Sequence, residues 1–115
     1  MSSIFVRAKL TPKAGREAEF DAIVEQFVKA VAEGEPGTRG FGWYRDAGGA
    51  YVVIEHYESA DAVVAHVANV GHLFAPLGEL VATSEPLEVH GEANEEIREL
   101  WAAFDPVFLP TVAAI

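Results

Sequence analysis

The sequence predicts a single α+β domain with a ferredoxin-like βαββαβ fold, and three observations support this prediction. The chain has 115 residues, of which 50% are hydrophobic and 23% charged, and this suits one domain with a well-buried core. Its hydrophobic pattern changes between a period of two, typical of strands, and a helical period. The segments follow in the order strand, helix, strand, strand, helix, strand. We therefore expect a four-stranded antiparallel sheet with two helices on one face.

The first half of the chain predicts a strand, a helix and a hairpin. Residues 4–10 alternate between apolar and polar side chains, which indicates a strand with one buried face. Residues 16–34 carry apolar side chains at helical spacing and end at a glycine. Two β-rich runs, 41–46 and 50–57, are separated by Ala-Gly-Gly at 47–49, and this spacing is typical of a β-hairpin.

The second half predicts a capped helix and a last strand. Ser59 has the chemistry of a helix N-cap, and the helix should run to about Val70. Residues 73–81 form a short, irregular apolar stretch, and residues 86–91 supply the fourth strand.

The whole chain, residues 1–115, is therefore interpreted as one domain with a core at 4–91 and a C-terminal extension at 92–115. Asn94 should cap an amphipathic helix in this extension. The last residues are strongly apolar, so we expect them to cover the open end of their own sheet or to reach across a neighbouring subunit.

The charge of the chain excludes two classes of partner. Eighteen acidic residues stand against eight basic ones, and from Asp46 onward Arg98 is the only basic residue. Such a chain repels the phosphates of nucleic acids and of anionic lipids, and no apolar run is long enough to span a membrane. We therefore expect no nucleic-acid partner and no membrane partner. The absence of cysteine and of a leader-like start predicts a cytoplasmic protein.

The face of the sheet away from the helices predicts a homodimer. It carries Phe5 between Arg7 and Lys9, and the hairpin places aromatic side chains on both of its faces. Exposed apolar area forfeits roughly 25 cal/mol for each Å² left unburied. Packing of two sheets face to face about a two-fold axis would cover it. The alternative is a monomer in which the apolar tail covers this face.

The segment at 51–66 resembles the antibiotic biosynthesis monooxygenase family. Its strand ends in Glu-x-Tyr, a capping Ser follows, and a His lies on the next helix. The Glu-Pro-Gly turn at 35–37 is similar to the Pro-Gly turn before the family's second strand. The resemblance covers roughly residues 4–91 and implies a dimeric α+β barrel. It also implies a cofactor-independent monooxygenase that oxidises a small electron-rich aromatic, such as a quinol, phenol or anthrone, with O₂.

Such a reaction needs a base, donors that hold a phenolate, and a dry cavity. His66 is the best candidate base, because it lies on the apolar face of the second predicted helix and imidazole exchanges protons near pH 7. Glu55 and Tyr57 share one face of a strand. Tyr57 would donate to a substrate oxygen, while Glu55 would orient His66 or act as the base. The alternative is a purely structural network of the three side chains.

Four further residues are candidates for substrate binding: Trp43, Tyr44, Phe74 and Arg7. The aromatic side chains offer flat surfaces to a ring, with core packing as the alternative. Arg7 could hold an anionic substrate or pair with an acid across the sheet.

No metal and no other cofactor is expected. Glu55 and His56 are neighbours on a strand and point to opposite faces, so they cannot share a metal site. Haem-degrading members of the superfamily use an Asn on the first strand, a Trp on the second helix and a His just beyond it. Here the first strand has no Asn and His66 stands at the Trp position, although His72 keeps haem degradation open. Two further alternatives are a non-catalytic dimeric ligand-binding or stress-related domain, and an isomerase or lyase that uses the same base.

Overall fold

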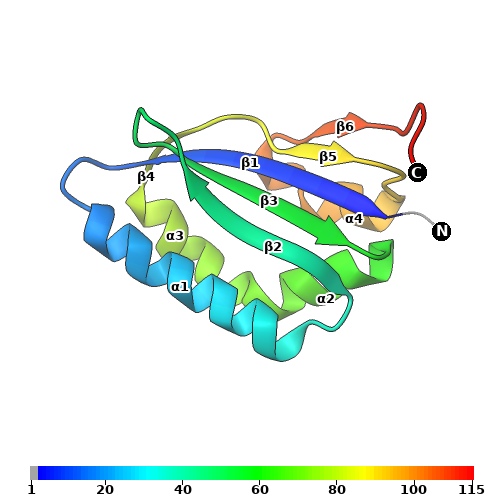
Figure 1. The fold of residues 1–115 in the computed structure, drawn as a ribbon, viewed down its shortest axis with the longest axis horizontal. Helices are drawn as coiled ribbons and strands as arrows, with labels where there is room; N and C mark the ends of the chain where they lie inside the picture. The colour runs from blue at the N-terminus through cyan, green and yellow to red at the C-terminus, as the bar shows by residue number, and fades with distance from the viewer. Residues whose placement is uncertain (1–2) are drawn as a thin grey trace.

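A computed structural model describes residues 3–115 as a sheet backed by helices (Figure 1). Met1 and Ser2, on which the prediction of no leader partly rests, lie outside the described residues. The elements in chain order are β1 (Ile4–Pro12), α1 (Glu17–Gly34), β2 (Thr38–Arg45), β3 (Tyr51–Tyr57), α2 (Ala60–Val70), the 3-10 turn η1 (Gly71–Leu73), α3 (Phe74–Leu80), β4 (Val81–Ser84), β5 (Glu88–His90), α4 (Glu95–Leu100), η2 (Ala102–Phe104) and β6 (Val107–Leu109).

The sheet has six strands, and the prediction of four is therefore wrong. Its order is β2-β3-β1-β5-β6, and β4 also pairs with β1. The expected fourth strand is divided, because β4 pairs with residues 10–12 of β1 while β5 pairs with residues 5–7. Pro86 lies in the gap between β4 and β5, and proline has no N–H to donate to a ladder. The sixth strand comes from the C-terminal extension.

The C-terminal extension packs on its own subunit as far as β6, whereas the apolar Val112 and Ile115 beyond it are fully exposed. Asn94 caps α4 by accepting a hydrogen bond from the backbone N–H of Ile97 at 3.0 Å, as its sequence position predicts. Ile97 and Trp101 are buried in the core beside β1 and β5. Asp105 then takes a left-handed conformation, with φ of 52°, and β6 follows it to pair in parallel with β5.

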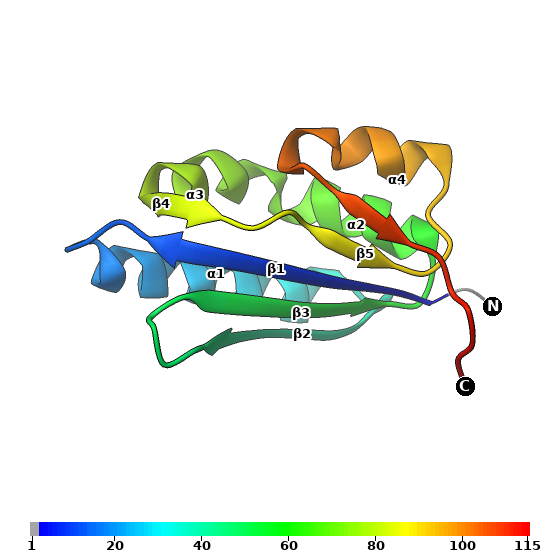
Figure 2. The ribbon, with the colours of Figure 1, turned by 90° about the horizontal axis from the view of Figure 1, so that it is seen from above.

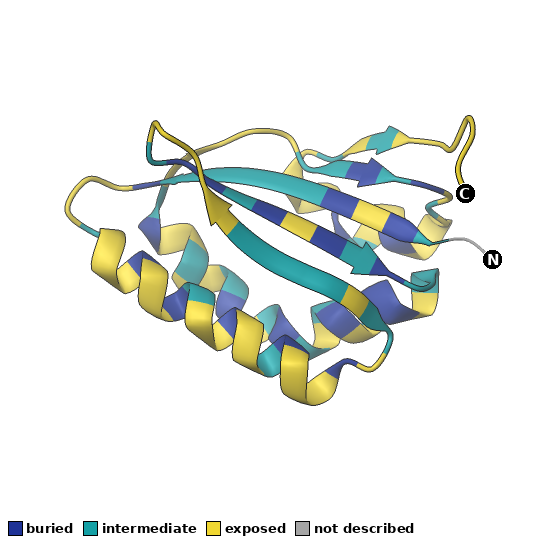
Figure 3. Cartoon of the chain, viewed as in Figure 1, coloured by how far each residue is buried: buried dark blue, intermediate teal, exposed yellow. Residues whose placement is uncertain are grey.

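Helices α1, α2 and α3 lie against one face of the sheet (Figures 1 and 2). The predicted alternation of β1 is confirmed: Ile4 and Val6 are buried, whereas Phe5 between them is 46% exposed. On β3 the residues facing the helices are buried and Ile54 is 43% exposed, which gives the alternating colours of this strand in Figure 3. The predicted N-cap of α2 is also confirmed, because Ser59 Oγ accepts from the N–H of Ala62 at 3.3 Å.

The opposite face of the sheet is open to solvent. Phe5, Ile54 and Tyr44 are its large exposed side chains, and Tyr44 is 61% exposed. Within residues 3–115, no helix combines the length and the hydrophobicity that a membrane crossing requires. The cytoplasmic location stays a prediction.

Candidate functional site

A cavity of about 270 Å³ lies on the helix-covered side of the sheet. Ala8, Val53 and Trp43 stand side by side across β1, β3 and β2, and all three line it. His66 of α2 and Glu55 of β3 are the polar side chains of its buried part. Its volume is close to the lower limit of about 300 Å³ for ligand pockets, so it suits a small molecule.

The mouth of the cavity is formed by two exposed segments. Residues 84–87 run from the end of β4 into the break before β5, and residues 103–105 run from η2 toward β6. Trp101, buried at the end of α4, forms the adjoining wall. The divided strand and the C-terminal extension therefore provide the entrance, while β1, β2 and β3 provide the floor.

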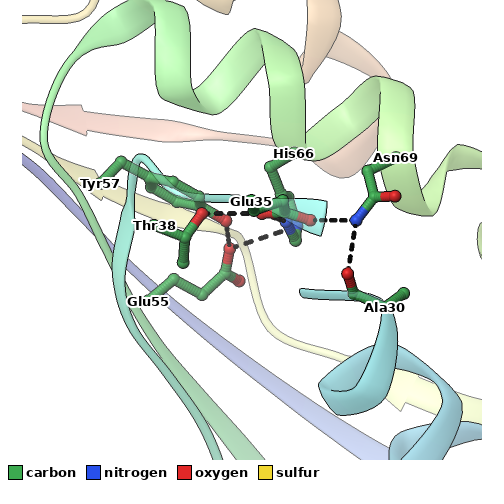
Figure 4. A network of polar contacts seen from close by, with 7 residues as sticks. All are labelled: Ala30, Glu35, Thr38, Glu55, Tyr57, His66 and Asn69. Atoms are coloured by element: carbon green, nitrogen blue, oxygen red, sulfur yellow. Dashed lines mark hydrogen bonds and ion pairs between the residues drawn. The ribbon is translucent and has the colours of Figure 1, made fainter. Parts of the chain in front are cut away.

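His66 is held by a buried carboxylate that the sequence analysis did not predict. The ring nitrogen Nδ1 lies 2.8 Å from Glu35 Oε1 (Figure 4). The side chain of His66 is 5% exposed and that of Glu35 only 1%. The second ring nitrogen, Nε2, lies 3.8 Å from Glu55 Oε1. The imidazole therefore stands between two carboxyl groups, one on either side.

Three donors surround the carboxylate of Glu35. Besides His66, Thr38 Oγ1 donates to Oε1 at 2.7 Å and Asn69 Nδ2 donates to Oε2 at 2.8 Å. Burial acts to raise the pKa of Glu35, but the hydrogen bonds from the three donors outweigh it, so the pKa lies below its ordinary value. Glu35 is consequently an ionised, fully hydrogen-bonded anchor.

The turn after α1 brings Glu35 to this position. Glu35 is the C-cap of α1, and its N–H bonds to the carbonyl of Val31. Two residues on, Gly37 packs so tightly on α2 that a Cβ atom there would lie 2.8 Å from the Cβ of Ala62. Asn69 also donates to the carbonyl of Ala30, one of the last carbonyls of α1, at 2.9 Å. The end of α1 is thus fixed against the helix that carries His66.

Glu55 and Tyr57 lie on one face of β3, as their spacing predicts, and both are buried. The Tyr57 hydroxyl donates a hydrogen bond to Glu55 Oε1. Burial raises the pKa of the Glu55 carboxyl, an effect that His66 and Tyr57 only partly oppose. Burial and the neighbouring carboxyl groups raise the pKa of Tyr57 well above its ordinary value. Tyr57 is therefore a neutral hydrogen-bond donor.

This arrangement fixes the tautomer of His66. An ionised carboxylate can only accept hydrogen bonds, so Nδ1 carries the proton that points to Glu35. In the neutral ring Nε2 then has a free lone pair, on the side where Glu55 lies. A proton taken up at Nε2 makes an imidazolium that the charge of Glu35 stabilises. The site can therefore accept a proton from a molecule in the cavity and return it.

The structure separates the other predicted site residues into two groups. Trp43 and Phe74 line the cavity. Tyr44 and Arg7 do not line it. Tyr44 follows Trp43 on β2 and so points to the open face. Arg7 lies 3.6 Å from both Glu85 and Glu88, in ion pairs beside the sheet.

Sequence reasoning missed Glu35, Thr38 and Asn69, as well as the mouth of the cavity. The signal for Glu35 was present in the Glu-Pro-Gly turn at 35–37, which the sequence analysis interpreted only as a turn. An acidic residue directly before such a turn, after an amphipathic helix, is the feature that could have identified it.

Metal ligands do not gather in the described part of the chain. No group of three or more His, Cys, Asp or Glu side chains within residues 3–115 is placed to hold a metal ion. His56 lies on the open face of the sheet, where its ring stacks on Phe5 with centroids 4.1 Å apart. It is therefore separated from Glu55 and His66 by the sheet.

The structure is a ferredoxin-like α+β fold in which a buried carboxylate–histidine pair lies beside a small cavity. The sequence profile of the family described as antibiotic biosynthesis monooxygenase matches residues 3–73. The chain belongs to this family, and the predicted resemblance is confirmed. Proteins of this family are commonly dimeric. No curated protein matches the chain.

Solved structures share the fold. The chain is similar to MupZ from Pseudomonas fluorescens at 20% identity, with 98% of this chain and 93% of that chain covered and a TM-score of 0.85. It is similar to Rv0793 from Mycobacterium tuberculosis at 24% identity, with 81% and 97% covered and a TM-score of 0.70. A candidate antibiotic biosynthesis monooxygenase from Caulobacter crescentus CB15 has 27% identity, 76% and 87% coverage and a TM-score of 0.71.

Proposed function

We propose that the protein is a cofactor-independent monooxygenase that oxidises a small electron-rich aromatic, such as a quinol, phenol or anthrone, with O₂. The observation that carries this proposal is the imidazole of His66, held at Nδ1 by ionised Glu35 and lying in the wall of an apolar cavity. General acid–base catalysis requires a group of this kind at hydrogen-bond reach of the substrate. Family membership supports the same class of reaction.

The first step is removal of a proton. In an anthrone, a C–H bond of the methylene carbon breaks, its electron pair stays on the carbanion, and the proton passes to Nε2 of His66. Glu35 stabilises the imidazolium through the Nδ1–H bond. The raised pKa of Glu55 makes its carboxyl a second group able to exchange a proton with the substrate oxygen.

The second step is reduction of O₂ by the substrate itself. The carbanion gives its electrons to O₂, one C–O bond forms, and the proton from His66 completes a hydroperoxide. Loss of water from the hydroperoxide converts the CH₂ group to a carbonyl. One oxygen atom therefore enters the product and the other leaves as water, with no external reductant.

Oxygen uptake with a panel of anthrones and quinols tests this proposal. The variant His66→Gln keeps a donor for Glu35 but removes the imidazole, so we expect the rate to fall by about 10²–10⁴-fold. His72→Ala, at an exposed position, is the matched control and should retain full activity. Unchanged oxygen uptake in His66→Gln would remove His66 from the mechanism.

Two other results would point to the alternatives. Tight binding of aromatic ligands without turnover of any substrate would identify a non-catalytic binding domain. Conversion of a substrate without oxygen uptake would identify an isomerase or lyase that uses the same base.

We also propose that the protein functions as a homodimer formed through the open face of the sheet. Phe5, Ile54 and Tyr44 are exposed on this face. Val107 and Leu109 of β6, at 43% and 39% exposure, extend its apolar area past β5. Two such faces packed about a two-fold axis would bury these side chains.

Sedimentation of two matched variants tests the dimer. Ile54→Asp places a charge on the open face, whereas Val28→Asp places one at a similarly exposed position on α1. We expect the wild type and Val28→Asp to sediment as dimers and Ile54→Asp as a monomer. A monomeric wild type would contradict the proposal.

A further inference from the structure

The cavity is lined mostly by apolar side chains, with three carboxyl groups among them and no lysine or arginine from the described part of the chain. Its charged or titratable residues are Glu55 and His66 in the buried part, and Glu85 and Asp105 at the mouth. None of the lysines or arginines within residues 3–115 lines it. A ligand that enters therefore passes two carboxylates and meets a third carboxyl group inside.

The two acidic residues at the mouth differ in their surroundings. Glu85 lies 3.6 Å from both Arg7 and Lys9, so its charge is shared with two cations that stand outside the cavity. Asp105 has no ion pair among residues 3–115. The negative charge of Asp105 is therefore not balanced by a neighbouring cation among the described residues, in contrast to that of Glu85. The net charge of −10 adds a long-range field of the same sign.

The proton balance of the site also disfavours a negatively charged ligand. A neutral substrate that gives a proton to His66 leaves an anion and an imidazolium side by side, which together carry no net charge. A substrate that already bears a carboxylate brings one negative charge more, and besides this imidazolium the lining residues offer no cation to pair with it. Burying an unpaired charge is strongly unfavourable.

We propose that the cavity selects uncharged aromatic molecules and rejects those that carry a carboxylate, sulfate or phosphate group, an inference that rests on the proposed function. Asp105, at the wall that the C-terminal extension supplies, is the residue that enforces this selection at the entrance. It lies outside residues 3–73, which the family profile matches.

Equilibrium binding of two matched probes tests the proposal without any turnover. 2-Naphthol is neutral near neutral pH and 2-naphthoate is an anion on the same ring system. Titration calorimetry under nitrogen at low ionic strength measures both affinities. We expect naphthoate to bind at least about tenfold more weakly, a difference of about 1.4 kcal/mol. Equal affinities, or no binding of 2-naphthol, would overturn the proposal.

Three variants assign the effect to the mouth. Asp105→Asn suits the left-handed backbone at this position, because asparagine tolerates it, and should strengthen naphthoate binding while leaving 2-naphthol unchanged. Ala103→Lys places a cation at the exposed mouth and should strengthen naphthoate binding further. Glu33→Gln removes the same charge at an exposed site on α1 away from the cavity, and should change neither affinity. If Asp105→Asn changes naphthoate affinity no more than Glu33→Gln does, Asp105 does not enforce the selection.

The outcome separates this inference from the proposed function. Selective binding of 2-naphthol with no oxygen uptake from any quinol would refute the oxidation and support the selection. Oxygen uptake that depends on His66 but is equally fast with carboxylated quinols would support the oxidation and refute the selection.

Discussion

Replacement of Glu35 by glutamine tests whether the charge of this side chain holds His66 in its tautomer. If the new amide oxygen takes the Oε1 position, it keeps the bonds from His66 and Thr38, but its NH₂ group then meets Asn69 Nδ2, another donor. Rotation of the Asn69 amide does not remove this clash of two donors, because the same Nδ2 must donate to the carbonyl of Ala30. The new amide should therefore take the reverse orientation.

The reverse orientation changes the proton on His66. The NH₂ group then faces Nδ1, which must become an acceptor, and the proton of the neutral ring moves to Nε2. The lone pair on the Glu55 side is lost, and the base with it. We expect Glu35→Gln to carry the Nε2–H tautomer and to lose about 10²–10⁴-fold in rate.

The loss of stability can be estimated from the hydrogen bonds. Each bond to a charged group contributes about 1.5–3 kcal/mol, against about 0.5–1.5 kcal/mol between neutral groups, and the burial cost of the carboxylate offsets part of the difference. A net loss of about 1–3 kcal/mol corresponds to a fall in Tm of about 4–12 °C for a chain of 115 residues.

Two measurements check this prediction. Nitrogen-15 chemical shifts of the His66 ring report the tautomer, and thermal unfolding followed by circular dichroism reports Tm. Glu33→Gln, at an exposed position on the same helix, should stay within about 0.5 kcal/mol of the wild type. A Glu35→Gln variant with the Nδ1–H tautomer and the wild-type Tm would refute the reasoning.

The pH dependence of the same pair has a defined sign. The pKa of Glu35 is lowered in the folded state, so its carboxylate stabilises the fold above the ordinary pKa of about 4.3. This contribution is lost as the pH falls through the lower, folded value. The stability of Glu35→Gln should consequently approach that of the wild type in acid. A constant difference across this range would contradict the assignment.

Two further predictions concern the supports of the site. Gly37→Ala should lower the free energy of unfolding by about 1–3 kcal/mol, because its new Cβ would press on that of Ala62. Urea unfolding measures this loss, and adding Ala62→Gly to the same chain should restore part of it. An unchanged free energy of unfolding would mean that the turn does not need this contact. Tyr57→Phe removes the hydroxyl donor to Glu55 and should raise the pKa of the Glu55 carboxyl further. Carbon-13 chemical shifts of that carboxyl measure its pKa. An unchanged or lower pKa would exclude the Tyr57 hydroxyl as the hydrogen-bond partner of Glu55.

Local patterns in the sequence were sufficient for the main elements of the fold. The alternation of β1, the cap at Ser59 and the cap at Asn94 depend on neighbours in the chain, and each appears where it was predicted. Glu55 and Tyr57 came together for the same reason, since residues two apart on a strand share a face. The predicted number of strands was wrong, because the pairing of β4 and β6 depends on partners far away in the sequence.

The partner of His66 could not be obtained from local patterns. Glu35 lies 31 residues before it, and their contact exists because a glycine at position 37 lets the turn approach α2. Burial of a carboxylate is unfavourable unless it is hydrogen-bonded, so an acid at a turn is normally interpreted as exposed. The donors on α2 and β2, at His66, Asn69 and Thr38, make its burial possible.

The break in the fourth strand connects the fold to the proposed selectivity. A continuous strand along β1 would close the sheet edge beside the cavity, but Pro86 interrupts the ladder and residues 84–87 line the mouth instead. The C-terminal extension then crosses this region, with Trp101 in the core and Asp105 at the entrance. Glu35 and His66 belong to the matched part of the chain, whereas the residues at the entrance lie beyond position 73. Changes at the entrance should therefore alter which ligands bind while leaving the tautomer of His66 unaltered, and changes at Glu35 should do the reverse.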